Sequence, residues 1–192
     1  MLLQEAKYTK QVPFELHEFS YALASNIETS KHLYGVMTAA RIKFETVETK
    51  LTTKREVGVM THKSQLITKH RLPNGQTLHI VNIHAINFVS AKLFIHEMEM
   101  IKEKVKQIEG PVIIGGDFNN WTDKRAHLIE EYREELGFKQ AEIIEKRHIK
   151  HLFAKPLDHI FYRGITLLHA EAIDTGRVSD HNPIYATFSV ES

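Results

Sequence analysis

Runs of apolar residues separated by turn-forming residues predict a chain built mainly from β-strands. Residues 77–83 alternate between apolar and polar side chains and follow the sequence Pro-Asn-Gly at 73–75, so we expect a hairpin whose other strand covers roughly residues 57–69. Residues 111–114 are apolar throughout and end at two glycines, which is typical of a central strand buried on both faces. Further strands are expected at residues 20–25, 34–44, 157–162 and 183–190.

Two segments carry helical periodicity. Ser90 is a candidate N-cap, and apolar residues recur after it on one face, at Phe94, Met98, Ile101, Val105 and Ile108. A second helix is expected from about Asp123 to Leu136, ended by Gly137. Because strands outnumber helices and a helix links two strands, the predicted class is mixed, α+β, with a large sheet component.

No repeat, low-complexity tract or Pro/Gly-rich linker divides the chain, so we expect a single domain over residues 1–192. The opening run Met1-Leu2-Leu3 resembles the inner half of a buried strand that is entered without a preceding turn. We interpret it as a sign of N-terminal truncation; a native start at a short edge strand is the alternative.

Charge and composition narrow the function classes. A formal net charge of +1 argues against a protein that coats nucleic acid nonspecifically, although it leaves room for a compact site that acts on one phosphate. The chain has no cysteine, which excludes disulfides, thiolate chemistry and cysteine-based zinc sites. No apolar stretch approaches the roughly 20 residues of a membrane span. We therefore expect no stable membrane insertion and a cytoplasmic location.

Polar residues stand at the ends of several predicted strands: Gln4 and Glu5, His84, Asp117 and Asn119, Asp158, and Asp180 and His181. Polar groups at the strand ends of one sheet can converge on a single cleft. Glu5 and Asp180 together suit a hard divalent cation such as Mg²⁺, which prefers oxygen ligands. The two histidines could polarise or protonate a phosphoryl oxygen.

The remaining groups complete a set for hydrolysis. Asp117 could orient or deprotonate a water nucleophile, and Asn119 could hold that water by hydrogen bonds. Asp158 could fix the tautomer of a histidine. This set suits in-line attack of water on a phosphate ester, with a metal ion neutralising the developing charge. Gly115-Gly116 lacks the Lys-Ser/Thr that follows in a nucleotide-cradling loop.

Each of these residues also has a purely structural interpretation. Asp117 could cap a turn after two glycines, and Asn119 could occupy a left-handed position. Asp158 could satisfy backbone groups at the start of a strand, and His181 could be a hydrogen-bonded core histidine. Trp121 could stack on a substrate, with core packing beside Phe118 as the alternative.

Five motifs in order resemble the endonuclease/exonuclease/phosphatase superfamily, the DNase I-like proteins. They are Gln4-Glu5, Asn82-x-His84, Gly116-Asp117-Phe118-Asn119, Leu157-Asp158-His159-Ile160-Phe161 and Ser179-Asp180-His181-Asn182-Pro183. The segment His84-Ala85-Ile86-Asn87-Phe88 further resembles a bacterial branch, the YafD-like proteins. The resemblance implies an α/β sandwich of two packed mixed sheets flanked by helices. It covers nearly the whole chain.

The resemblance also implies a role for each residue. Glu5 matches the metal-binding glutamate and Asp180 a metal-associated aspartate, with Mg²⁺ or Mn²⁺ as the cofactor. His84 matches the histidine that contacts the scissile phosphate. The water-activating pair is matched by Asp117 and Asn119, and the pair of a histidine and its orienting carboxylate by His181 and Asp158. Glu56, after Arg55, matches a glutamate that partners the first histidine; a solvated strand charge is the alternative.

The chain departs from the family pattern at its start, because the first motif, an asparagine on the opening strand, is absent. The loss of that strand leaves an exposed sheet edge, a candidate surface for homodimerisation. Two functions stay open: a metal-dependent phosphoesterase, and a noncatalytic binding domain that keeps the fold. The substrate of the first could be nucleic acid, a phospholipid headgroup or a small phosphate.

Overall fold

A computed structural model describes the chain at residues 1–11, 17–51, 64–85, 87, 89–143, 151–152, 155–176 and 181–190. The helices in these residues are α1 (Ala91–Lys106) and α2 (Asp123–Glu135). The strands are β1 (Leu2–Thr9), β2 (Ser20–Glu28), β3 (His32–Ala40), β4 (Thr46–Leu51), β5 (Ser64–Arg71), β6 (Thr77–His84), β7 (Val112–Asp117), β8 (Lys139–Gln140), β9 (His151–Leu152), β10 (Lys155–Pro156), β11 (Asp158–Arg163), β12 (Thr166–Ala172) and β13 (Ile184–Ser189). Arg55, Glu56 and Asp180 lie outside the described residues.

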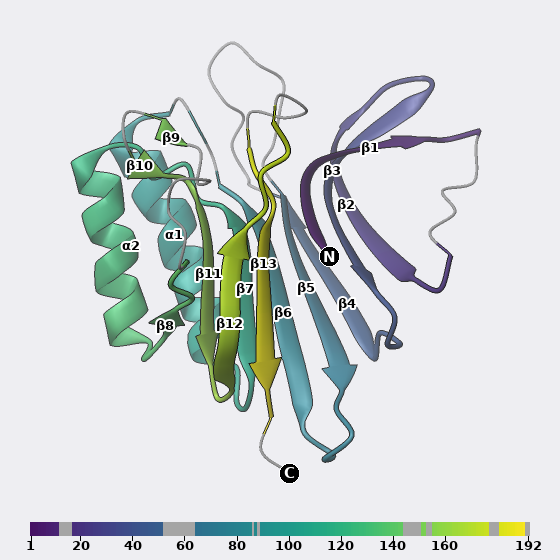
Figure 1. Cartoon of the computed structure of the whole chain (residues 1–192). Coiled ribbons are helices and arrows are strands. Elements are labelled where there is room, and N and C mark those ends of the chain that lie inside the picture. Colours follow the sequence, from purple (N-terminus) through teal and green to yellow (C-terminus); the bar gives the residue numbers. More distant parts are fainter. Residues whose placement is uncertain are drawn as a thin grey trace.

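A six-stranded sheet forms the centre of the molecule, in the order β4-β5-β6-β7-β11-β8 (Figure 1). The predicted hairpin is confirmed in its described part: β5 and β6 pair antiparallel around a turn in which the Gly75 amide donates to the Leu72 carbonyl. Residues 57–63 of the predicted first strand lie outside the described residues. Strands β6 and β7 are parallel, and α1 provides the crossover between them. A parallel pair needs such a long connection, which explains why a helix separates these two strands.

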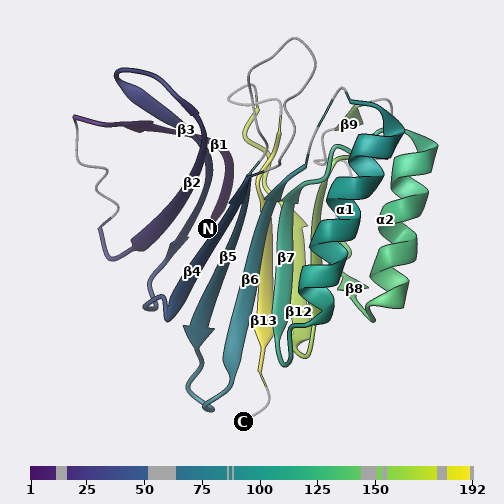
Figure 2. The same cartoon turned by 180° about the vertical axis from the view of Figure 1, so that it is seen from behind.

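Two smaller sheets lie on one face of the six-stranded sheet. One is β1-β3-β2 and the other is the hairpin β12-β13. Figure 1 shows them at separate places along the larger sheet, with β12 and β13 in front of β7 and β6. Both described helices lie on the opposite side, as the view from behind shows (Figure 2). The predicted α+β sandwich is confirmed.

Alternation along β7 explains the layers. Val112 and Ile114 belong to the core that also contains Phe94 and Met98 of α1, whereas Ile113 packs with the cluster beneath β12 and β13. Successive side chains of a strand point to opposite faces, so the continuous apolar run of β7 serves both layers. The prediction of a central strand buried on both faces is therefore confirmed.

Both predicted helices are confirmed. The Ser90 hydroxyl accepts a hydrogen bond from the Leu93 amide, and the predicted apolar stripe of α1 is buried except for Ile108, which packs just beyond the last turn. Gly137 follows α2 with a φ of 68°, the left-handed conformation expected at a helix end. Neither described helix is long and apolar enough to cross a membrane.

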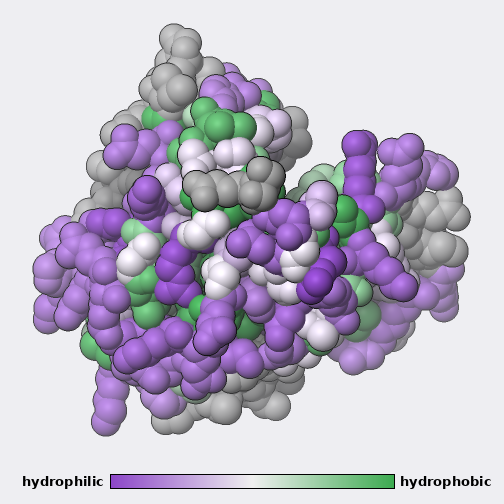
Figure 3. Space-filling model, turned by 90° about the horizontal axis from the view of Figure 1, so that it is seen from below, coloured by the Kyte–Doolittle hydropathy of each residue, from purple (hydrophilic) through white to green (hydrophobic). Residues whose placement is uncertain are grey.

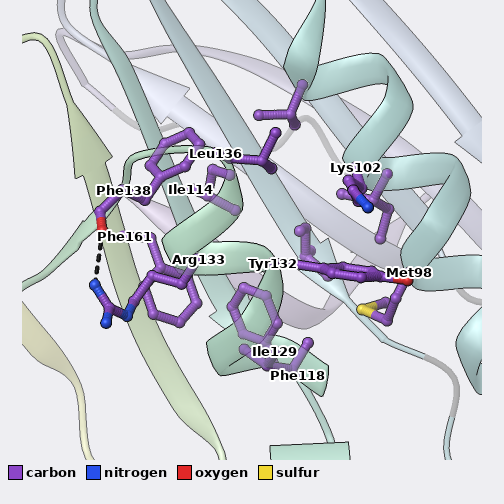
Figure 4. A pocket seen from close by; sticks show the side chains of 13 residues that line it. Met98, Lys102, Ile114, Phe118, Ile129, Tyr132, Arg133, Leu136, Phe138 and Phe161 are labelled. Atoms are coloured by element: carbon purple, nitrogen blue, oxygen red, sulfur yellow. Dashed lines mark hydrogen bonds between the residues drawn. The ribbon is translucent and has the colours of Figure 1, made fainter. Parts of the chain in front are cut away.

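A small apolar cavity of about 40 Å³ remains between the two helices and the sheet. Figure 4 shows Met98 and Tyr132 from the helices beside it, with Ile114 and Phe161 from the strands. The Lys102 ammonium lies 4.4 Å from the centre of the Tyr132 ring and pairs with Glu135, which ties α1 to α2. Because its lining is almost wholly apolar, this cavity suits neither water nor charged chemistry.

Three expectations need correction. Gln4 and Glu5 do not follow the first strand but lie inside β1, at a bulge between Leu3 and Ala6. The opening run is not the inner half of a buried strand, because β1 is the edge of its sheet and Leu3 is 37% exposed. Strands β4 and β12 were not expected, because residues 46–51 and 166–172 contain too many polar side chains for a clear strand pattern.

Two buried histidines make stability depend on pH. Burial lowers the pKa of His70 in β5 and of His79 in β6 below the ordinary value. Between about pH 6.5 and the lowered folded values, the unfolded chain therefore binds more protons than the folded chain, and the free energy of unfolding falls as the pH falls. Urea denaturation at pH 7.5, 6.5 and 5.5 measures this slope.

We expect the double variant His70→Gln/His79→Gln to show a shallower slope than the natural chain. His127→Gln, at an exposed position of α2, is the control and should leave the slope unchanged. Equal slopes in the double variant and the natural chain would contradict the assignment.

Candidate active site

Three of the predicted site residues lie in one row across the central sheet. His84 ends β6 and pairs with Asp117 at the end of the parallel strand β7. Asp117 pairs in turn with Asp158 at the start of the antiparallel strand β11. Residues that are directly opposite on neighbouring strands project to the same face, so this register gathers an imidazole and two carboxylates at one sheet edge.

Gly116 makes this row compatible with close strand packing. Its φ is 142°, and a Cβ built on it would lie 1.9 Å from the carbonyl oxygen of Ile83 on the neighbouring strand. Only glycine fits such a contact, since the clash would be with backbone rather than with a flexible side chain. The glycine before the aspartate is thus required by the approach of β6 to β7.

Asp117 is held as a hydrogen-bond acceptor by Asn119. The Asn119 backbone amide donates to Asp117 Oδ1 at 2.9 Å, and Asn119 Nδ2 donates to Asp117 Oδ2 at 3.2 Å. Asn119 Nδ2 also donates to the Ala85 carbonyl at 3.0 Å, and the residue is only 2% exposed. With its donors engaged in this way, Asn119 orients the Asp117 carboxylate; its predicted contact with a water nucleophile stays a prediction.

Arg125, which the sequence did not single out, locks this arrangement from α2. Its Nη1 donates to the Asn119 carbonyl at 2.9 Å and its Nη2 donates to the Val89 carbonyl at 3.1 Å. The guanidinium is buried 4.2 Å from the centre of the Phe94 ring. These contacts hold Asn119 at a φ of 47°, a left-handed conformation that asparagine tolerates better than most residues.

Glu5 reaches the row from the other layer. The bulge in β1 gives Glu5 a φ of 55°, and its Oε1 lies 3.8 Å from His84 Nε2. His84 Nε2 lies 3.7 Å from Asp117 Oδ2 as well, so a protonated imidazole would pair with both carboxylates. The Glu5 side chain is 80% exposed, which leaves its carboxylate accessible to solvent and solutes.

A buried amide ties the Glu5 bulge to the central sheet. Asn82 of β6 is fully buried; its Oδ1 accepts from Gln4 Nε2 at 2.8 Å and its Nδ2 donates to the Met37 carbonyl at 2.9 Å. Asn82 therefore links β6 to both β1 and β3. The sequence motif Asn82-x-His84 follows from this geometry, because residues two apart on a strand share a face.

His181 and Asp158 form the second acid–base pair. Asp158 Oδ2 lies 2.5 Å from His181 Nδ1, as a carboxylate that orients a histidine would. The neighbouring Asn182 is buried, and its Oδ1 accepts from the Thr175 hydroxyl at 2.9 Å. This bond fixes the segment that carries His181 against the loop after β12.

Trp121 makes a polar contact near the site. Its Nε1 donates to Asn87 Oδ1 at 2.9 Å, and its ring centre lies 5.5 Å from the Arg125 guanidinium. The sequence suggested two interpretations of Trp121, stacking on a substrate and packing beside Phe118. Neither interpretation includes this hydrogen bond. It joins the segment after β6 to the segment after β7.

A large cleft of about 870 Å³ lies on the face of the sheet that carries β1 and β13, and His84 and Asn119 are buried behind its lining. Glu5, Asp117, Asp158 and His181 all line it. A carboxylate held as an acceptor and an oriented histidine on the same cleft can together remove and deliver protons. Within the described residues, no three acidic or imidazole groups are placed to hold a metal ion by themselves. Asp180, the predicted metal-associated aspartate, is outside them.

Comparison with known proteins identifies the family. The model of the Endonuclease/Exonuclease/phosphatase family matches residues 1–181. A UPF0294 protein from Erwinia tasmaniensis is 36% identical over 199 residues, covering 100% of this chain and 71% of that protein. A UPF0294 protein from Yersinia enterocolitica is 36% identical over 195 residues, covering 98% and 72%. The chain therefore belongs to the endonuclease/exonuclease/phosphatase family.

Solved structures of the same fold agree. An endonuclease/exonuclease/phosphatase from Beutenbergia cavernae superposes with a TM-score of 0.71 at 14% identity, over 98% of this chain and 62% of that one. A 3′ phosphatase from Neisseria, bound to a DNA hairpin product, superposes with a TM-score of 0.64 at 13% identity, over 98% and 88%. At these identities the likeness establishes the fold alone.

Replacement of Arg125 tests the link between α2 and the Asp117 loop. We expect Arg125→Met to lower the free energy of unfolding by on the order of 3 kcal/mol, because two buried carbonyls lose a charged donor. Arg71→Met, at an exposed position, should change it by less than about 0.5 kcal/mol. Urea denaturation measures both; equal stability of the two variants would contradict the role given to Arg125.

Proposed function

We propose that this protein hydrolyses a phosphate ester by in-line attack of a water molecule, with a divalent metal ion as cofactor. The observation that carries the proposal is that Asp117, an oriented acceptor, lies beside Asp158 on the neighbouring strand, and that Asp158 contacts His181. All three side chains line one cleft. Membership of the family supports the reaction class.

In this proposal Asp117 receives the proton of the attacking water. Its two oxygens accept hydrogen bonds from Asn119, which keeps the carboxylate in one orientation. A base that is already oriented loses little entropy when it meets the water, which favours proton transfer. His84, within 4 Å of Asp117 and Glu5, would neutralise charge on the phosphoryl oxygens when it is protonated.

Asp158 and His181 would act on the other side of the reaction. Asp158 contacts the Nδ1 atom of His181 and so selects the tautomer that exchanges its proton through Nε2. A histidine held in this way can protonate the leaving oxygen or stabilise its charge.

Mg²⁺ or Mn²⁺ would be held by Glu5 and Asp180. The donor set fits a hard cation, because both residues supply carboxylate oxygens and Glu5 offers an exposed one at the cleft. The metal ion would supply positive charge next to the phosphate.

Two solved structures of the same fold suggest which substrate classes to test. The Neisseria protein is described as a 3′ phosphatase, and a zebrafish relative of the same fold as complexed with single-stranded DNA product. We propose a phosphate ester as the substrate, with nucleic acid, a phospholipid headgroup and a small phosphate as the classes to test. A cytoplasmic location stays a prediction.

A binding domain without turnover is the second candidate. It is favoured by the observation that Asn119 Nδ2, the expected donor to the water nucleophile, already donates to the Ala85 carbonyl and to Asp117 Oδ2. The two candidates differ in turnover, so hydrolysis and metal binding are measured separately.

Hydrolysis of bis(p-nitrophenyl) phosphate and p-nitrophenyl phosphate in Mg²⁺ or Mn²⁺ tests the first candidate. We expect Asp117→Asn and His181→Gln each to lower kcat by about 100-fold or more, because each removes a proton-transfer group while keeping its size. EDTA should abolish activity. His96→Gln, at an exposed position of α1, should retain full activity. Turnover that survives Asp117→Asn would refute the assignment of the base.

Calorimetric titration with Mg²⁺ tests the metal site without turnover. We expect saturable binding that Glu5→Gln weakens roughly tenfold, because it removes one carboxylate ligand. Glu103→Gln, on the exposed face of α1, is the matched control. Binding without hydrolysis would favour the second candidate, and equal affinities of the two variants would exclude Glu5 as a ligand.

A further inference from the structure

His159 is a buried histidine that the proposed reaction does not use. It follows Asp158 in β11, so the two side chains point to opposite faces of the central sheet. The His159 ring stacks on Phe161 at a centroid distance of 5.4 Å and an interplanar angle of 9°. Phe161 belongs to the core beneath the helices, where its ring centre lies 5.2 Å from that of Phe118 (Figure 4). His159 therefore lies on the helix side of the sheet, behind the candidate site.

The imidazole of His159 contacts both chain neighbours of Asn119. Its ring packs edge-on against Phe118, with centroids 5.6 Å apart and an interplanar angle of 75°. Its Nε2 lies 3.1 Å from Asn120 Nδ2 and 3.4 Å from Asn120 Oδ1. Asn120 is only 5% exposed, so this polar contact is made inside the protein. One side chain thus holds the residues on either side of the left-handed Asn119.

Gln140 of β8 contacts the other side of the His159 ring. Its Nε2 lies 3.3 Å from His159 Nδ1, and β8 pairs with β11 through Gln140 and Phe161. A neutral imidazole has one donor and one acceptor nitrogen. Because the Gln140 amide nitrogen is a donor, Nδ1 is the acceptor, and Nε2 donates its proton to Asn120 Oδ1. Each donor then meets an acceptor, as a stable buried polar network requires.

We propose that His159 is a positioning residue for the Asp117 carboxylate and acts through Asn119. Asn119 supplies two hydrogen bonds to Asp117 while its φ is 47°. A left-handed residue other than glycine persists only where its surroundings hold it. The guanidinium from α2 holds its carbonyl, and the His159 ring holds its two neighbours.

The start of β11 thereby supports both halves of the site. Asp158 contacts His181 on one face of the sheet, and His159 anchors the loop of residues 117–121 from the other face. This role rests on the proposed function in one respect, because Asp117 is the base of that reaction. The anchoring of the loop does not depend on turnover and is measured without it.

Three replacements of His159 separate its two polar contacts. His159→Gln places an amide near the position of Nε2 and can keep the contact with Asn120. His159→Asn places an amide near the position of Nδ1 and can keep only the contact with Gln140. His159→Phe keeps a ring stacked on Phe161 without either hydrogen bond.

Hydrogen exchange of the Asn119 amide, followed by NMR, reports the positioning directly, because this N–H donates to Asp117. We expect His159→Phe and His159→Asn to accelerate it by about tenfold, the factor that corresponds to the loss of one buried hydrogen bond. His159→Gln should stay within about threefold of the natural chain, because it keeps the Asn120 contact. The amides of β5 are the reference for global stability.

Asn74→Ala is the matched control variant. It removes the hydrogen bonds of the Asn74 side chain with Gln76 in the turn between β5 and β6. That turn lies at the lower end of the molecule, opposite the start of β11 (Figure 1). The lower end is mostly hydrophilic, with hydrophobic residues showing near its middle (Figure 3). The Asn119 exchange rate should be the same in Asn74→Ala as in the natural chain.

Hydrolysis of bis(p-nitrophenyl) phosphate gives a readout that a general loss of stability would not move. We expect His159→Phe and His159→Asn to lower kcat about tenfold and to change KM less than about twofold, because the base is displaced and substrate contacts are not. His159→Gln should restore kcat. A purely structural role would give the same loss in His159→Gln as in His159→Asn.

The proposal is overturned if Asn119 exchange is unchanged in His159→Phe, or if the amides of β5 accelerate equally. It is also overturned if His159→Asn and His159→Gln behave alike. Absence of turnover in the natural chain would refute the proposed hydrolysis, whereas the exchange rates alone decide whether His159 positions Asn119.

Discussion

The register of β6, β7 and β11 is the constraint on which the rest of the site depends. Parallel pairing brings the last residue of β6 beside the last residue of β7, and antiparallel pairing brings the first residue of β11 beside the same position. A slip by one residue would turn every one of these side chains to the opposite face. Gly116 protects the register, because only a residue without Cβ fits against the carbonyl of Ile83.

Around this row, buried polar groups set the positions of the residues that face the cleft. Asn119 fixes both oxygens of Asp117, and Arg125 holds Asn119 in its left-handed conformation. Asn82 positions the second layer in a similar way. Its side-chain oxygen accepts a hydrogen bond from Gln4, the residue that precedes Glu5 in the bulge of β1. Such buried donors are costly unless they are satisfied, so the polar network around the site also stabilises the sandwich.

The second layer gives the cleft a polar end and an apolar part. Its site end is bordered by carboxylates and a histidine, and its length is bordered by strand edges and an apolar floor. The same two strands, β1 and β13, therefore border both the polar end and the apolar part of the cleft.

The sequence by itself determined the elements whose signals are local. The cap at Ser90, the turn at Gly75, the apolar run of β7 and the glycine after α2 are each decided within a few residues. The five motifs further indicated the family, which the comparisons confirm, and a set of candidate site residues, which stays a prediction. Only the tertiary structure decided which residues meet. Arg125 of α2 reaches the carbonyls of Asn119 and Val89, whereas the contact of Asp158 with His181 was already implied by the family resemblance. The bulge that aims Glu5 and the cleft bordered by β1 and β13 likewise depend on strand pairing between distant segments. Pairing of that kind is set by the packing of the whole sheet, so no local pattern in the sequence could reveal it.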